Sequence, residues 1–95
     1  MKQLNIGLFG FGNVGHGLYD VLQRINSDNV YIRRICVRDI HKNRGVKADF
    51  TDNPDDIFND RDINLIVEVI DDAEAAYNIV KRALKMRIPV VSGNK

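Results

Sequence analysis

The sequence is short of several features that would mark particular classes of protein. It has a single cysteine, Cys36, so no disulfide can form within the chain and a reducing compartment is expected. No apolar run approaches the roughly 20 residues of a membrane span. Basic and acidic residues nearly balance, with a net charge of +1, which leaves no overall attraction to nucleic acid or to an anionic membrane. We predict neither kind of partner.

Reactive side chains are also sparse in the patterns that catalysis or metal binding needs. No group of histidine, cysteine and carboxylate residues has the spacing of a metal site, and no serine or cysteine nucleophile has a convincing histidine partner. We therefore predict no bound metal. Residues 1–3 lead directly into an apolar run, so we expect no signal peptide and a cytoplasmic location.

The sequence does contain the composition and periodicity of one small α/β domain. Its 95 residues are 44% hydrophobic and 28% charged, as in a globular protein. Strand-like apolar runs alternate with segments of helical period, which predicts a Rossmann-like, doubly wound parallel sheet, truncated at about four to five strands. It would occupy residues 1–95. The predicted strands are 4–9, 30–37, 63–70 and 88–92, with a short one near 48–50; the predicted helices are 14–25, 54–59 and 73–87.

Each long helix is predicted to turn an apolar stripe toward the sheet. Asp71 and Glu74 have the spacing of a capping box at the start of the second long helix, and Thr51 or Asn53 is expected to cap the short one. The stripes are Val14, Leu18, Val21, Leu22 and Ile25 in the first long helix, and Ala73, Ala76, Tyr77, Val80, Ala83 and Leu84 in the second.

Three glycines join the first strand to the first helix. In a dinucleotide-binding turn, Gly10 would allow the tight turn, Gly12 would let a pyrophosphate approach the bare backbone, and Gly15 would let the helix pack close to the sheet. The amides and positive dipole end of the helix would face the phosphates. This turn follows a strand and opens a helix, which is the context that the motif requires.

Charged residues follow the second strand, where the adenosine end of a dinucleotide would lie. Asp39 comes at about the roughly 20-residue distance of the acid that binds ribose hydroxyls. Arg38 beside it can pair with a 2′-phosphate and stack on adenine. With His41, Lys42 and Arg44 nearby, the cluster favours NADP, or the use of both NADP and NAD. For Lys42 and Arg44 a solvated basic loop is the alternative.

Five other residues receive simpler interpretations. His16, in the first turn of the first helix, is predicted to face solvent, and Cys36 to be a small buried apolar residue. Glu68 ends a strand at the edge of the sheet where ligands bind, so a structural and a functional role are both open. Arg33 and Arg34 indicate that the second strand lies at an edge or has exposed ends.

Four stretches, in order and over essentially the whole chain, resemble homoserine dehydrogenase. In that family the nucleotide-binding domain opens with this glycine turn and has an arginine–aspartate step after the second strand. It then shows a strand ending in an acidic residue and closes on an Asn-Lys sequence after a short strand. The matching stretches are Asn5–Gly15, Val37–Asp39, Asp62–Ile70 and Pro89–Lys95.

The resemblance implies the NAD(P)-binding domain of an enzyme that interconverts aspartate semialdehyde and homoserine in threonine and methionine biosynthesis. Family members bind substrate, carry the catalytic lysine and acidic residues and form their dimer through a second domain, which this chain lacks. We therefore expect cofactor binding without turnover, and a homo-oligomeric parent. Ser92 and Lys95 would lie near the nicotinamide, with Lys95 the candidate catalytic residue on the substrate side. The implied cofactor-binding residues are Gly10, Phe11, Gly12, Asn13, Val14, Gly15, Arg38, Asp39, Ser92 and Lys95.

Two departures from the family pattern leave other functions open. Asp71-Asp72 replaces a Gly-Gly pair, and these carboxylates would satisfy helix amides but repel phosphate. Ser92-Gly93 replaces Thr-Ala, which is a mild change. The alternatives are another two-domain dehydrogenase, of the aspartate dehydrogenase or glucose-fructose oxidoreductase type, and a regulatory nucleotide-sensing Rossmann domain. An open sheet edge beyond the last strand makes self-association plausible.

Overall fold

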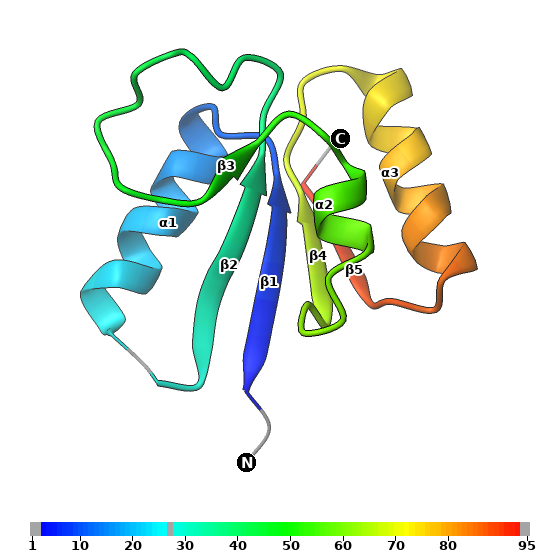
Figure 1. Ribbon diagram of the computed structural model, residues 1–95, viewed down its shortest axis with the longest axis horizontal. Helices are drawn as coiled ribbons and strands as arrows, with labels where there is room; N and C mark the ends of the chain where they lie inside the picture. The colour runs from blue at the N-terminus through cyan, green and yellow to red at the C-terminus, as the bar shows by residue number, and fades with distance from the viewer. Residues whose placement is uncertain (1–2, 27, 94–95) are drawn as a thin grey trace.

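A computed structural model describes residues 3–26 and 28–93. Over these residues, five parallel strands form one sheet in the order β3-β2-β1-β4-β5, with α1 on one side and α2 and α3 on the other (Figure 1). This confirms the predicted Rossmann-like α/β fold. The elements in chain order are β1 (Leu4–Phe9), α1 (Asn13–Ile25), β2 (Val30–Cys36), β3 (Phe50–Thr51), α2 (Asp55–Phe58), β4 (Leu65–Glu68), α3 (Ala73–Lys85) and β5 (Val90–Ser92).

The core has two layers because side chains alternate between the faces of the sheet. In β1, Leu8 belongs to the layer that contacts α1, and its neighbour Phe9 to the layer beneath α2 and α3. Phe9 packs on Phe58 of α2 with 5.4 Å between ring centroids. β1 pairs with β2 on one side and β4 on the other, so it lies at the centre of the sheet. The turn that follows β1 is therefore held on both sides.

The predicted contact stripes of both long helices need correction. In α1, Val14, Val21 and Ile25 are exposed, and the helix packs through Leu18 and through Tyr19 and Leu22 beside it. In α3, Tyr77 and Leu84 are exposed, whereas Ile79, which the predicted stripe omitted, is buried with Ala76 and Ala83. The apolar arc of each helix is wider than the strip that touches the sheet. Periodicity therefore locates the helix but not its rotation.

Both predicted helix caps also shift. The cap of α3 is Asp72, not Asp71: its Oδ1 accepts hydrogen bonds from the amides of Glu74 at 3.0 Å and Ala75 at 3.2 Å. α2 begins one residue later than predicted, with Pro54 at the cap position. The Asn53 carboxamide still accepts from the first helical amide, that of Asp55, at 3.0 Å.

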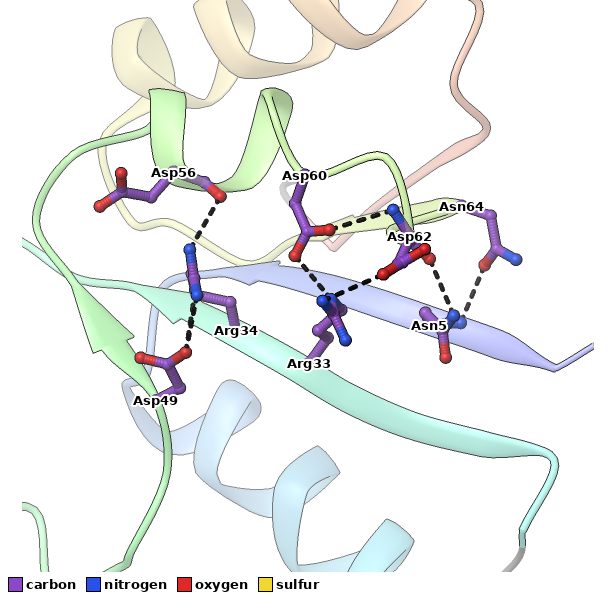
Figure 2. Close-up of polar contacts among 8 residues, drawn as sticks. All are labelled: Asn5, Arg33, Arg34, Asp49, Asp56, Asp60, Asp62 and Asn64. Atoms are coloured by element: carbon purple, nitrogen blue, oxygen red, sulfur yellow. Dashed lines mark hydrogen bonds and ion pairs between the residues drawn. The ribbon is translucent and has the colours of Figure 1, made fainter.

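Arg33 and Arg34 lie in a strand that is interior rather than at the edge. They lie in the middle of β2 and are only partly exposed, so neither an edge strand nor exposed ends describes them; β3 pairs with Ile35 and Cys36 and leaves this part of β2 without a neighbour on that side. Arg33 contacts the carboxylates of Asp60 at 2.6 Å and Asp62 at 3.2 Å (Figure 2). Arg34 contacts Asp49 at 2.9 Å and donates to the carbonyl of Asp56 at 3.2 Å. The ion pairs join Arg33 and Arg34 to aspartates that lie outside the sheet.

None of the helices in the described part of the chain has the length and apolar character to cross a membrane.

Candidate functional site

The three glycines of the turn after β1 have three different surroundings. Gly10 has φ +98°, and a Cβ there would lie 3.0 Å from the carbonyl oxygen of Val69. A Cβ on Gly15 would lie 2.5 Å from the carbonyl oxygen of Gly10, so this glycine is required for close packing of α1. A Cβ on Gly12 would meet nothing within 4 Å. Only at Gly12 would a side chain project into open space, which is where a ligand could approach the backbone.

The N-terminus of α1 keeps its amides available. Gly12 is the cap residue and provides no side-chain hydrogen bond, and the first turn contains no acidic residue. A helix start of this kind attracts anions, because its unsatisfied amides and its dipole both favour negative charge. α3 differs, since the Asp72 carboxylate already occupies its first amides.

A cleft of about 590 Å³ opens beside the glycine turn, at the carboxyl ends of β1, β2 and β4. Four of the predicted cofactor-binding residues line it, namely Gly10, Phe11, Gly12 and Arg38. Ligands bind in open α/β sheets at this edge, beside the strand where the order reverses. These four of the predicted residues thus lie together at one cleft of the described part of the chain.

Basic residues form one wall of the cleft. Arg38, Lys42 and Arg44 line it, and the Arg38 side chain is 84% exposed, with its Nη2 atom 3.8 Å from Oδ2 of Asp72. Arg44 is fixed instead: its Nη1 donates to the carbonyl oxygen of Asp39 at 2.7 Å, and its guanidinium lies 5.4 Å from the Phe50 ring centroid. Because Lys42 and Arg44 line the cleft, their positions favour a role in binding over that of a solvated basic loop.

Residues 10–95 match the family model described as homoserine dehydrogenase, NAD binding domain. The chain belongs to this family. It is 32% identical to the homoserine dehydrogenase of Helicobacter pylori over 99% of this chain and 24% of that protein, and 34% identical to that of Methylobacillus glycogenes over 100% and 26%. A crystal structure of the Staphylococcus aureus homoserine dehydrogenase matches with a TM-score of 0.87 at 34% identity, over 100% of this chain and 26% of that one.

These comparisons confirm the family and the cofactor class that the sequence predicted, NAD or NADP. The chain spans about a quarter of the length of the relatives that it matches. The residues present suit a dinucleotide: the open space at Gly12 and the uncapped start of α1 fit a pyrophosphate, and the basic wall fits the adenosine end.

Several of the residues predicted to bind the cofactor are not among those that line the cleft. Asn13 and Val14 are in the first turn of α1 with exposed side chains, so they could contribute through their amides. The Asp39 side chain is not in the cleft wall: its Oδ1 accepts from the amide of His41 at 2.9 Å and so shapes the loop. The Ser92 hydroxyl donates to Glu68 at 2.6 Å. Lys95 falls outside the described residues.

Glu68 has a structural position in the domain. It is completely buried at the end of β4, and its Oε2 accepts from the amide of Ile70 at 2.6 Å while its Oε1 accepts from the Ser92 hydroxyl. The carboxylate thus joins the end of β5 to the turn that leads into α3. Hydrogen bonds of this kind stabilise a buried charge that would otherwise be costly.

An aromatic cluster supports the glycine turn from the α1 side. The Phe11 ring stacks on His16, with 4.9 Å between centroids, and meets Phe50 edge to face at 5.4 Å. His16 is half-exposed rather than fully solvent-facing, because one side of its ring is covered by Phe11. The Tyr19 hydroxyl donates to the carbonyl of Lys47 at 3.1 Å, which fastens the loop after β2 to α1. No sequence motif pointed to this cluster.

Cys36 is buried, as predicted, although it also borders the cleft. Burial, followed by the charges of Asp52 and Asp56, raises the pKa of its thiol to about 11. The thiol is therefore protonated at neutral pH and unreactive as a nucleophile.

Sequence reasoning missed part of the cleft wall. Asp52 and Pro54, after β3, and Asn78, in α3, border it together with Asp71 and Asp72. Asp52, Pro54 and Asn78 carry no motif of their own, and their positions follow from how α2 and α3 pack against the sheet.

Proposed function

We propose that this chain is the cofactor-binding domain of a homoserine dehydrogenase, an NAD(P)H-dependent oxidoreductase that interconverts aspartate semialdehyde and homoserine in threonine and methionine biosynthesis. The observation that carries the proposal is the cleft itself, in which Gly12, with open space beside its backbone, and an uncapped helix start lie beside an exposed arginine, Arg38. The homoserine dehydrogenases among its relatives support the substrate.

In the proposed complex, the open backbone at Gly12 and the amides of Asn13 and Val14 would hold the pyrophosphate. The dipole of α1 offsets its negative charge. Arg38 binds the adenosine end, where its guanidinium can pair with a 2′-phosphate or stack on adenine. Ser92 and Lys95, by resemblance to the family, would contribute to holding the nicotinamide.

The nicotinamide supplies or accepts a hydride when it is bound, and the residues of this chain bind it and orient it. Residues 1–95 would form the cofactor half of the enzyme. A second domain would hold the substrate against the nicotinamide, exclude water and form the contacts of a homo-oligomer. We expect the enzyme to act in the cytoplasm.

The first test is calorimetric titration of the chain with NAD and with NADP, comparing wild type with Arg38→Ala. We expect both cofactors to bind, and the substitution to weaken NADP binding by about tenfold or more, because a charge-assisted hydrogen bond to the 2′-phosphate is lost. NAD should lose less. Arg24→Ala is the matched control, because Arg24 lies in the last turn of α1, at the opposite end of that helix from the glycine turn.

Each result bears on one part of the proposal. Failure of the wild type to bind either cofactor would contradict the function. Binding of both with equal affinity, unchanged by Arg38→Ala, would contradict the role of Arg38 while leaving the cofactor site in place.

A further inference from the structure

Asp72 faces Arg38 across the mouth of the cofactor cleft. Arg38 follows β2 and Asp72 precedes α3, and both line the cleft. The Oδ2 atom of Asp72 lies 3.8 Å from Nη2 of Arg38, while its Oδ1 caps α3. One carboxylate therefore serves two purposes, with one oxygen on the helix amides and the other toward the arginine.

This pairing sets up a competition at the adenosine end of the site. The 2′-phosphate of NADP carries negative charge and would need the same guanidinium that Asp72 holds. It would also approach the negative charges of Asp71 and Asp72, with little screening at a few ångströms. The ribose of NAD has an uncharged hydroxyl at this position, so it meets neither cost.

We propose that Asp72 is a specificity-determining residue, which lowers the preference of this domain for NADP over NAD by competing for Arg38. The proposal rests on the cofactor-binding function proposed above. The basic wall of Arg38, Lys42 and Arg44 favours the phosphorylated cofactor, and Asp72 offsets part of that preference. The result is a domain that accepts both cofactors with similar affinity.

The two oxygens of Asp72 allow its charge to be tested apart from its cap. Asparagine is as good a helix cap as aspartate, since its side-chain oxygen accepts the same amide hydrogen bonds. Asp72→Asn should therefore leave α3 and the thermal stability of the chain nearly unchanged. It removes the charge that attracts Arg38 and repels phosphate.

The experiment measures the affinities of wild type, Asp72→Asn and Asp71→Asn for NAD and NADP by calorimetry at low ionic strength. Asp72→Asn should tighten NADP binding roughly twofold to fivefold, which is the range of an exposed ion pair, with a smaller gain for NAD. Asp71→Asn is the matched control: it removes a charge from the same cleft, and we expect a smaller gain because the ion pair with Arg38 is made by Asp72. The gain should shrink at high salt.

A double-mutant cycle decides whether the effect passes through Arg38. In an Arg38→Ala background, Asp72→Asn should no longer improve NADP binding by the same factor. An unchanged ratio of NADP to NAD affinity in Asp72→Asn, or an equal gain with and without Arg38, would overturn the inference while the cofactor-binding function stands. Failure of the wild type to bind either cofactor would overturn both.

Discussion

At the scale of single residues, the three glycines of the turn after β1 differ: Gly10 and Gly15 are required for the fold, whereas Gly12 leaves space for a ligand. Gly10 is required by the backbone, because its φ of +98° and the nearby Val69 carbonyl leave no place for a side chain. Gly15 is required by the contact between α1 and the turn. Gly12 has neither constraint, since its φ of −78° suits any residue and the space around its Cα is open. Its lack of a side chain leaves that space open to a ligand.

Two serine substitutions test this division. Gly12→Ser should weaken NAD binding by about tenfold without lowering the melting temperature, because serine is a favourable helix cap whose hydroxyl would take an amide from the pyrophosphate. Gly10→Ser should instead cost roughly 1–3 kcal/mol of stability, since serine is strained at positive φ. Thermal unfolding and calorimetric titration of both variants measure the two effects. Unfolding of Gly12→Ser at a much lower temperature would show that Gly12 is a structural residue.

The sequence alone could predict that Gly10 and Gly15 are required by the turn, because the turn from strand to helix is a recurring geometry; the ligand role of Gly12 stays a prediction. A turn from strand to helix constrains the same few residues wherever it occurs. The pairing of Arg38 with Asp72 could not be predicted in this way. It depends on where two loops lie after β2 and before α3, and on which of two adjacent aspartates caps the helix. The residue at which α3 begins decides which carboxylate caps the helix. The spacing of Asp71 and Glu74 predicted Asp71, but the cap is Asp72.

At the scale of elements, ion pairs fasten β2 to the loop between α2 and β4, far from the cleft. Asp60 contacts Arg33 and also accepts from the amide of Asp62 at 3.0 Å (Figure 2). Two asparagines extend this network to β1. The side chain of Asn5 in β1 donates to the carbonyl of Asp62 at 2.8 Å, and the backbone amide of Asn5 donates to the side chain of Asn64, also at 2.8 Å. These contacts fix the position of α2 relative to the sheet.

The pKa of Asp60 leads to a prediction for stability. Burial acts to raise this pKa, but the hydrogen bond from Arg33, the amide of Asp62 and the charges of Arg33 and Arg34 together hold it below its ordinary value. A carboxyl group whose pKa is lower in the folded state stabilises the fold above the unfolded-state pKa of about 3.9, and this contribution is lost as the pH falls through the folded-state pKa.

Asp60→Asn should accordingly lower the melting temperature at pH 7 by a few degrees, as expected for a partly exposed ion pair in a small domain. The difference from wild type should disappear as the pH falls well below 3.9. Asp62→Asn is the control, because its side chain is 69% exposed and makes the longer contact with Arg33, so its effect should be smaller. A difference between Asp60→Asn and wild type that stays constant from pH 7 into the acid range would contradict this account.

At the scale of the whole molecule, the parallel arrangement of the strands followed from the sequence, because strands that alternate with helices form βαβ units of fixed hand. The order β3-β2-β1-β4-β5 across the sheet was not predicted. The rotation of α1 and α3 did not follow. Val21 and Ile25 on α1, and Tyr77 and Leu84 on α3, are as apolar as the residues that pack, yet they are exposed. β5 is the last strand of the described sheet, and Val91 in it is 55% exposed. Apolar surface thus remains on both helices and along one edge of the sheet.

We expect this chain, as the cofactor half of the proposed enzyme, to bind cofactor without turning it over. The described residues provide a floor at the glycine turn and walls from the loops after β2 and β4. In the proposed enzyme, a second domain would hold the substrate against the nicotinamide. Positioning of reactants contributes roughly 7–11 kcal/mol to enzymatic rates, so its loss should slow hydride transfer at least about 10⁵-fold. The chain should therefore show cofactor binding in calorimetry and no measurable oxidation of homoserine when NADPH formation is followed by absorbance. The full-length enzyme of Staphylococcus aureus, assayed alongside, gives the reference rate, and turnover by the 95-residue chain within a few orders of magnitude of it would show that residues 1–95 contain a complete active site.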